Sequence, residues 1–370
     1  MDQTVTPTAI EVFHLSAPLA TPRRNAFGAM DRRPCLLVRL TDASGRVGWG
    51  EGFANWPVFG AAHRRLILTE LLAPAITGRT FESPAAMWYD LTAGFRAIAL
   101  QANEPGPFEQ CIAALDIAAW DMVARRADVP LFAALGGARG TTRPYASALT
   151  GATQRALVPP MLDRGWTGFK VKVGFGTDDD ARAVENLRGL IGDVDLMLDA
   201  NQQWNVESAL SAARGLARYH PLWLEEPLPA NAPPADWATL AAESPIDLAA
   251  GENIRGVEEF DRAIAFLSWV QPDAIKWGGL SCMAPLAEAT RAAGAQFAPH
   301  YLGGGIGLLA TAHLACATGA EWLEVDVSEN PLREALSGDA ISLDGGVVTL
   351  TDRPGLGILP EPAVLQRFAV

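Results

Sequence analysis

The feature that most constrains the fold is a series of charged residues, each of which closes a short hydrophobic run. These residues are Lys172 after GFKV, Asp199 after VDLML, Glu225 after PLWL and Glu252 after IDLAAG. Successive members are 27, 26 and 27 residues apart, and the segments between them have helical character. Alternating strands and helices predict parallel strands joined by crossover helices. A (β/α)₈ barrel of about 250 residues allows about 31 residues per unit, so each step matches one compact βα unit.

The three carboxylates of this series predict a metal site. Charged residues at the C-terminal ends of barrel strands face the active-site mouth. Asp199, Glu225 and Glu252 would lie side by side there, where their charges repel and raise each other's pKa. A divalent cation removes that cost, and ligands that are all oxygen atoms suit Mg²⁺. A single acidic residue after a strand is commonly a helix cap, but three at regular spacing favour the metal site. Glu226 is the weaker candidate beside Glu225.

Lys170 and Lys172 stand two residues apart on one strand, so their side chains point to the same face. Burying two lysines against packed helices is costly, which favours the interior mouth of the barrel. There each lysine is expected to lower the pKa of the other, which makes a neutral lysine base available near pH 7. The alternative is a pair of surface lysines at the strand end.

Asp273 and His300 follow successive strands and are again 27 residues apart. A carboxylate that binds one imidazole nitrogen fixes the tautomer and strengthens the other nitrogen as a base. The pair therefore predicts a second acid–base group, although a lone histidine at a strand end is often structural. Lys276, three residues after Asp273, could also face the mouth, and Glu324 could hydrogen-bond a substrate carboxylate if it is protonated.

The remainder of the chain predicts a second domain beside the barrel. With 370 residues, of which 49% are hydrophobic, the chain is long enough for both. Residues 9–16 and 34–52 have strand patterns, residues 17–33 are expected to form a mobile loop, and residues 63–126 have helical periodicity. Residues 342–358 are expected to form a terminal hairpin and tail. The predicted domains are an α+β capping domain with specificity loops (1–128), a (β/α) barrel (129–335) and a C-terminal segment that packs back on the cap (336–370).

Composition excludes several classes of function. The net charge is -13 and no Lys/Arg block is present, which argues against nucleic acid or an anionic membrane as partner. The four cysteines form no CxxC pair, which favours reduced thiols. The N-terminus lacks the pattern of a signal peptide, and no run of about 18 apolar residues occurs, so we expect a cytoplasmic protein.

Seven motifs together resemble the enolase superfamily and, within it, the mandelate racemase subgroup of the mandelate racemase/muconate lactonizing enzyme family. They are FKVKVG, LDAN, WLEEP, AGEN, PDAIKWGG, APHY and WLEVD, and they follow the family's order through the barrel. The first third of the chain resembles the family's capping domain. The resemblance implies a modified TIM (β/α)7β-type barrel with an N-terminal α+β cap completed by the C-terminal tail.

The resemblance also implies roles for individual residues. Lys172 resembles the base on one face of the substrate and Lys170 its partner, whereas His300 with Asp273 resembles the base or acid on the opposite face. Asp199, Glu225 and Glu252 resemble the Mg²⁺ ligands, and Glu324 resembles the donor to the substrate carboxylate. Lys276 also matches the base of the muconate cycloisomerase subgroup, which lacks a histidine like His300. The candidate substrate-binding residues are Arg24, Trp56, Asn201, Lys276 and Tyr301.

The activity implied by the resemblance is Mg²⁺-dependent removal of the α-proton of a small carboxylate through an enediolate. Dehydration of an acid sugar is favoured, and racemisation or epimerisation of an α-substituted carboxylate is the alternative, with cycloisomerisation behind it. Arg23 and Arg24 would suit a polar substrate, whereas Phe53, Trp56 and Phe59 would suit an apolar one, so the loops leave the substrate open. A non-catalytic acid-binding barrel is disfavoured because none of the expected charged positions is lost. The resemblance also suggests a symmetric homo-oligomer.

Overall fold

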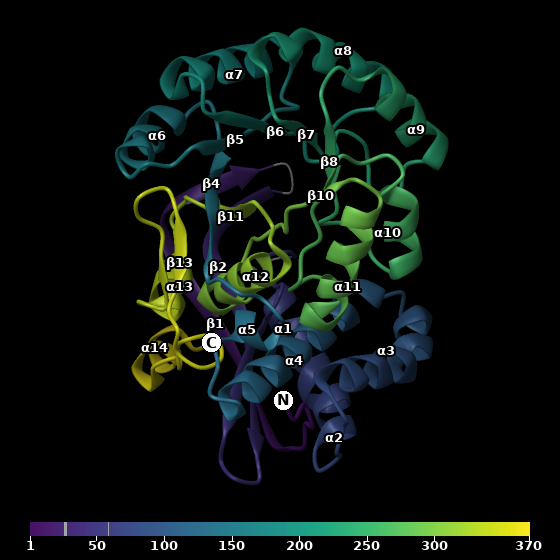
Figure 1. The fold of residues 1–370 in the computed structure, drawn as a ribbon, viewed down its shortest axis with the longest axis vertical. Coiled ribbons are helices and arrows are strands. Elements are labelled where there is room, and N and C mark those ends of the chain that lie inside the picture. Colours follow the sequence, from purple (N-terminus) through teal and green to yellow (C-terminus); the bar gives the residue numbers. More distant parts are fainter. Residues whose placement is uncertain (26–27, 58) are drawn as a thin grey trace.

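The computed structural model describes residues 1–25, 28–57 and 59–370, and the side chains of residues 23–25 lie outside the described part. Figure 1 shows a cap of strands and helices from the first third of the chain, drawn in purple and blue, below an arc of alternating strands and helices in teal and green. The yellow C-terminal elements lie beside the cap strands (Figure 1).

The barrel contains the eight parallel strands that the sequence predicts. They are β4 (Thr141–Leu149), β5 (Gly168–Lys172), β6 (Asp195–Asp199), β7 (Trp223–Glu225), β8 (Leu248–Ala250), β9 (Trp269–Val270), β10 (Gln296–Phe297) and β11 (Trp322–Asp326). The strand order is β10-β9-β8-β7-β6-β5-β4, and β11 pairs with β4 on its other side. Among the described residues no ladder joins β10 to β11, so β10 is paired only with β9.

A helix follows each barrel strand. These helices are α6 (Gln154–Asp163), α7 (Thr177–Ile191), α8 (Val206–Leu216), α9 (Pro234–Glu243), α10 (Val257–Ala263), α11 (Gly279–Ala292), α12 (Gly305–Thr318) and α13 (Pro331–Ser337). Helix α7 buries Val184, Leu187 and Ile191, whose spacing places them on one face toward the strands. Large side chains such as Tyr145 and Trp223 fill the barrel interior, which is therefore a packed core rather than a pore.

The cap consists of a three-stranded antiparallel sheet covered by helices. Its elements are β1 (Pro7–Asn25), β2 (Gly28–Asp42), β3 (Val47–Gly52), α1 (Gly60–Ile67), η1 (Leu68–Leu72), α2 (Ala73–Ile76), α3 (Pro84–Gln101), α4 (Pro105–Arg126) and α5 (Leu131–Ala134). Helix α4 packs so closely on β3 that a Cβ at Gly48 or Gly50 would collide with the carbonyl oxygens of Ala118 and Ala114. The two glycines therefore set how closely helix and strand approach each other.

The expectation of a loop over residues 17–33 was wrong. Strand β1 continues to Asn25, β2 begins at Gly28, and Arg24 pairs with Ala29 near the end of the ladder. The register shifts between Pro18 and Arg23, which accommodates the prolines that suggested a loop. Antiparallel backbone pairing thus overrides the local turn composition of this segment.

The C-terminal segment forms the expected hairpin, β12 (Ile341–Ser342) and β13 (Val348–Leu350), followed by α14 (Pro362–Phe368). Strand β13 pairs with β4 of the barrel, and Ala369 forms a bridge with Leu15 of the cap. The tail therefore contacts both parts, while the domain limits given above stay a prediction. Among the described residues no helix combines the length and apolar character needed to cross a membrane.

A buried ion pair joins the cap to the barrel. Arg33 in β2 is 5% exposed, and its guanidinium lies 2.8 Å from the Asp326 carboxylate at the end of β11 and 2.6 Å from the Ser328 hydroxyl. Burial raises the pKa of Asp326, but Arg33 and Arg333 more than offset this and hold it below its ordinary value. The carboxylate therefore stays charged and depends on its arginine partners.

We expect Arg33→Met to lower the free energy of unfolding by about 3–5 kcal/mol, because it leaves the Asp326 charge buried with one partner fewer. Urea denaturation followed by circular dichroism measures this. The matched control is Arg214→Met, which removes an exposed ion pair to Glu243 and should cost less than about 1 kcal/mol. Equal losses in the two variants would contradict the assignment of Arg33 as a cap–barrel anchor.

Candidate active site

The register of the parallel strands brings the charged strand ends together. Lys172 pairs with Asp199, and Asp199 pairs with Glu225, so these three residues lie in one row across β5, β6 and β7. Glu252 follows two residues after the end of β8, the next strand. The row is buried: Asp199 and Glu225 are each 1% exposed. Polar groups this deeply buried need charged or hydrogen-bonding partners.

Lys170 is the centre of the charge network on one side of the site. Its ammonium group lies 2.6 Å from Glu225, 2.9 Å from Glu324 and 3.7 Å from Asp199. Lys172 forms an ion pair with the same Asp199 carboxylate, and a quarter of its side chain is exposed. Lys170 is therefore enclosed by carboxylates, whereas Lys172 borders open space.

His300 and Asp273 form the expected pair. Nδ1 of His300 lies 2.8 Å from the Asp273 carboxylate, whose other oxygen accepts the backbone N–H of Ile275. Nε2 of His300 lies 3.5 Å from Glu252 and 3.7 Å from Glu324. The aspartate therefore fixes one ring nitrogen and directs the other toward the carboxylates of the site.

Lys276 completes the network on the Glu252 side. Its ammonium group lies 2.8 Å from Glu252 and 2.9 Å from the side-chain oxygen of Asn253, and it stands over the ring of Phe53 at 4.9 Å. Each of the three candidate ligand carboxylates thus has at least one lysine partner.

The expectation of a lysine that is neutral near pH 7 is not met in this structure. Burial and the charge of Lys170 lower the pKa of Lys172, but Asp199 and Glu225 together outweigh them, so the pKa is raised. The pKa of Lys170 is raised as well, because Glu225 and Glu324 outweigh burial. The sequence shows that the two lysines are neighbours, but it does not show that carboxylates from other strands lie beside them.

Glu324 also differs from the expectation of a protonated donor. Burial raises its pKa, but Lys170 and His300 outweigh this and hold the pKa below its ordinary value. The ionised group accepts a hydrogen bond from the hydroxyl of Tyr145 at 3.0 Å. For His300 burial acts in the opposite direction and lowers the pKa. The charges of Glu252, Glu324 and Asp273 outweigh burial and raise the pKa of His300 to about 9.

The donor set fits a hard cation, although the side chains do not form a ready metal cage. Among the described residues no group of three or more His, Cys, Asp or Glu side chains is close enough to hold a metal ion. Asp199, Glu225 and Glu252 are instead paired with lysines. Burial and the charge of Glu252 hold the pKa of the neighbouring Glu226 well above its ordinary value, as expected where carboxyl groups crowd together. Oxygen donors of this kind suit Mg²⁺.

A pocket of about 310 Å³ opens between the cap and the barrel mouth. Its charged lining consists of Arg33, Lys172, Glu252, Lys276, His300, Glu324 and Asp326. Two of the residues predicted to bind substrate, Trp56 and Asn201, line it as well. Lys172 and His300 thus border one cavity, from strands β5 and β10, which are well separated in the strand order.

Two of the predicted substrate-binding residues are not placed in this pocket. Tyr301 is 1% exposed, and its hydroxyl donates to the carbonyl oxygen of Gly304, so it braces a loop rather than facing the cavity. The side chain of Arg24 lies outside the described residues. Lys276, the remaining candidate, lines the pocket and forms an ion pair with Glu252.

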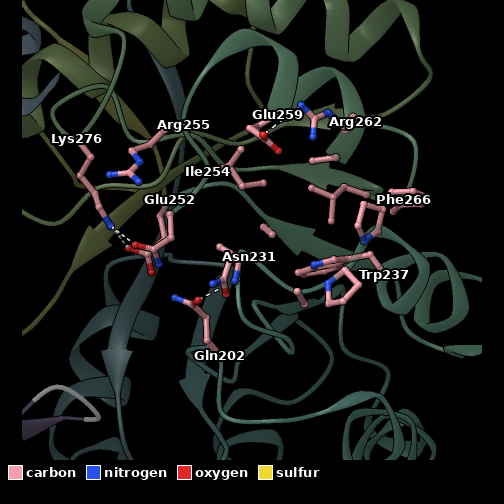
Figure 2. A pocket seen from close by; sticks show the side chains of 18 of the residues that line it. Gln202, Asn231, Trp237, Glu252, Ile254, Arg255, Glu259, Arg262, Phe266 and Lys276 are labelled. Atoms are coloured by element: carbon pink, nitrogen blue, oxygen red, sulfur yellow. Dashed lines mark hydrogen bonds and ion pairs between the residues drawn. The ribbon is translucent and has the colours of Figure 1, made fainter. Parts of the chain in front are cut away.

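A larger groove of about 920 Å³ adjoins the first pocket and shares Gln110, Glu252, Asn253 and Lys276 with it. Figure 2 shows that it runs from Lys276 and Glu252 toward the rings of Trp237 and Phe266. Glu259 and Arg262 form an ion pair along its rim, 3.2 Å apart (Figure 2). The groove provides space beside the smaller pocket.

Sequence reasoning missed three residues that shape the site. Arg33 lines the pocket from the cap, Gln271 donates to Glu225 at 2.9 Å, and Tyr145 donates to Glu324. A signal existed for Gln271, which stands two residues before Asp273 at the end of the same strand. No local pattern distinguishes Arg33, because its partner Asp326 is almost 300 residues away.

The fold and the site define a class of barrel enzymes with an acidic, lysine-rich mouth under an α+β cap. Residues 8–136 match the family model described as the mandelate racemase / muconate lactonizing enzyme N-terminal domain, and residues 154–364 match the one described as enolase C-terminal domain-like. The chain therefore belongs to the mandelate racemase/muconate lactonizing enzyme family of the enolase superfamily.

Individual relatives cover nearly the whole chain. A solved mandelate racemase/muconate lactonizing enzyme from Bordetella bronchiseptica is 42% identical and covers 98% of this chain and 99% of its own, with a TM-score of 0.91. An enolase from Bradyrhizobium complexed with magnesium and mandelic acid is 27% identical, covers 100% and 99%, and has a TM-score of 0.86. The L-talarate/galactarate dehydratase of Salmonella typhimurium is 30% identical over 92% of this chain and 85% of its own.

Other relatives are named dehydratases, cycloisomerases and racemases. The protein is accordingly an enzyme of the lyase or isomerase type.

Proposed function

We propose that this protein is a Mg²⁺-dependent acid-sugar dehydratase that removes the α-proton of a carboxylate substrate. The observation that carries the proposal is that Lys172 and His300, which is held by Asp273, border one pocket beside a cluster of carboxylates. Two acid–base groups on one cavity allow a proton to be taken at one carbon and another to be delivered nearby.

The cation would be held by Asp199, Glu225 and Glu252. When bound, it would stabilise the negative charge that develops on the substrate carboxylate. The solved Bradyrhizobium relative with magnesium and mandelic acid supports Mg²⁺ as the ion and a carboxylate as the substrate. Gln271 and Trp223 both donate to Glu225 and so hold that carboxylate in place.

Dehydration divides the work between the two groups. One group, Lys172 or His300, removes the α-proton and leaves an enediolate. Loss of the β-hydroxyl, with a proton supplied by the other group, gives water and an enol that becomes a 2-keto acid. Asp273 fixes Nδ1 of His300, so that only Nε2 exchanges protons with the substrate.

The polar lining favours a polyhydroxylated acid. Hydroxyl and amide groups border the pocket, contributed by Gln110, Ser147, Thr150, Asn201, Asn253 and Ser328. Such groups bind the hydroxyls of an acid sugar and are poorly matched to an apolar substrate. Relatives named arabinonate dehydratase and L-talarate/galactarate dehydratase, 28% and 30% identical, support the same reading.

The second candidate is a racemase or epimerase of an α-substituted carboxylate. It is favoured by the apolar part of the pocket, where Met30, Phe53, Trp56 and Leu302 form a wall. In that reaction no hydroxyl leaves, and the proton returns to the opposite face of the α-carbon. The two candidates therefore share the first step and differ in the fate of the enediolate.

The test is a library of acid sugars and α-substituted carboxylates, incubated with the enzyme and Mg²⁺. We expect a 2-keto acid, detected as its semicarbazone, from at least one acid sugar. Inversion of optical rotation without a keto acid would favour the racemase. If an acid that is shown to bind gives neither product, both candidates are contradicted.

Replacing Glu252 by Gln should weaken Mg²⁺ binding and leave the fold intact, because the mouth of a barrel tolerates change better than its core. Removing a partner that only orients a ligand costs roughly 10–100-fold in affinity, and loss of a ligand should cost at least as much. Calorimetric titration of Mg²⁺ measures the effect. Glu243→Gln, at an exposed site on α9, is the control. Wild-type Mg²⁺ affinity in Glu252→Gln would remove Glu252 from the ligand set.

A further inference from the structure

One short segment of the cap contacts the residues that follow His300 and those that follow Asp273. It runs from Glu51, near the end of β3, to Asn55. Glu51 is 1% exposed, and its two carboxylate oxygens accept the backbone N–H groups of Gly304 and Gly307, the latter at 2.8 Å. These glycines lie at the start of α12, directly after the loop that carries His300.

The loop is shaped to receive this carboxylate. A Cβ atom added at Gly303 would lie 2.7 Å from one Glu51 oxygen, and one at Gly304 would lie 3.0 Å from the other. Burial raises the pKa of Glu51 to about 7, against the lowering by the two backbone N–H groups and the Cys35 thiol. Burial of this carboxyl group is thus unfavourable, but its hydrogen bonds to Gly304 and Gly307 hold the start of α12.

Two further contacts extend the same brace. The Asn55 side chain donates to the carbonyl oxygen of Leu302 at 2.9 Å, two residues after His300. The backbone N–H of Phe53 donates to the carbonyl oxygen of Ile275 at 2.9 Å, two residues after Asp273. Within five consecutive cap residues, Glu51, Phe53 and Asn55 therefore contact the segments that follow the two members of the pair.

Among the described residues, ladder hydrogen bonds support this region of the barrel from one side only. Strand β10 is two residues long and, among the described residues, pairs with β9 but not with β11. His300 follows this strand, and its backbone N–H donates to the carbonyl oxygen of Pro272 on the β9 side at 3.0 Å, whereas no ladder fixes the β11 side in the described structure. The contacts from Glu51 and Asn55 lie where that support is needed.

We propose that Glu51 and Asn55 are positioning residues that hold the His300 loop so that the imidazole stays on Asp273 and faces the pocket. Neither residue touches the reacting atoms in this account. The position of the His300 imidazole therefore depends on how the cap packs against the barrel. The activity consequences rest on the proposed function, whereas the geometric claim does not.

The geometric claim is tested by NMR of the protein labelled with ¹⁵N in its histidine side chains. The chain has five histidines, and the His300 resonances are those missing from His300→Asn. Glu51→Gln keeps the size of the side chain but points an NH₂ group at one of the two backbone N–H donors. We expect the His300 Nδ1–H resonance to shift and broaden in this variant. Glu51→Asp, which keeps the charge, should restore part of the wild-type signal.

Asp121→Asn is the matched control. Asp121 is also a fully buried cap carboxylate that accepts two backbone N–H groups, but these belong to Trp49 and Leu356 rather than to the His300 loop. This variant should leave the His300 resonances unchanged even if it loses stability. Should Glu51→Gln fail to fold, Asn55→Ala, which removes one hydrogen bond, should show a smaller shift of the same resonance.

The second arm measures α-proton exchange with each stereoisomer of a substrate. Glu51→Gln should slow exchange on the face served by His300 by about tenfold or more, since full loss of an acid–base group costs about 10²–10⁴-fold. Exchange on the face served by Lys172 should stay within about twofold of wild type. A wild-type His300 resonance in Glu51→Gln and Asn55→Ala would overturn the proposal. Absence of exchange in the wild-type enzyme, with the resonance shifted as expected, would instead refute the proposed function alone.

Discussion

Replacing His300 by Asn should abolish net turnover while α-proton exchange persists on the stereoisomer whose proton faces Lys172. The reason is geometric: the two residues border the same pocket from strands β5 and β10, so each is expected to reach one face of the α-carbon. Acid–base groups contribute about 10²–10⁴-fold to the rate, so the loss in kcat should be at least 10²-fold. Product assays and ¹H NMR in heavy water measure the two quantities separately.

Lys172→Ala should show the reverse pattern, with exchange retained on the face of His300. His220→Asn, which alters an exposed histidine outside the pocket lining, is the control and should behave as wild type. The two-face arrangement would have to be abandoned if both variants lost exchange on the same stereoisomer and retained it on the other.

Removing divalent metal should reduce turnover by at least about 10²-fold, and Mg²⁺ should restore it. Loss of a single electrostatic donor to developing charge already costs about 10²–10³-fold, and a cation does more than one donor. Without the cation, the charged partners of the carboxylates are Lys170, Lys172, Lys276 and His300. Dialysis against EDTA, followed by elemental analysis and assay, measures the effect.

Metal binding has a second readout that does not depend on activity. A cation that binds only the folded chain should raise the free energy of unfolding by about 2.7 kcal/mol at 100 times its Kd. The rise should be absent in Asp199→Asn. Full activity of protein shown to be free of metal would refute the metal dependence of the reaction.

Much of the barrel could be predicted from the sequence because strand ends repeat with a charged residue and a helical segment between them. The hydrophobic runs before Asp199 and Glu225 are strands in the structure, and the register places both residues side by side. Local pattern was less informative where strands are short: β9 and β10 have two residues each. Their functional residues, Asp273 and His300, lie in the loops beyond.

The failures have a common physical cause, which is that partners distant in sequence decide the outcome. Residues 17–33 have loop composition, yet backbone pairing makes most of them strand. Lys170 and Lys172 predict mutual lowering of pKa, yet carboxylates from other strands raise both. Glu51 has no local signal for its contact with Gly304, which is more than 250 residues away. Charge and burial at such positions emerge only from the tertiary structure.

The central claim is that this enzyme removes an α-proton with Lys172 and His300 on the two sides of one pocket. The most direct measurement is deuterium incorporation at the α-carbon of a panel of acid sugars and other α-substituted carboxylates, in heavy water with Mg²⁺. The account predicts incorporation into at least one acid by the wild-type enzyme and none above background by the Lys172→Ala/His300→Asn double variant. Incorporation by the double variant at the wild-type rate would contradict it.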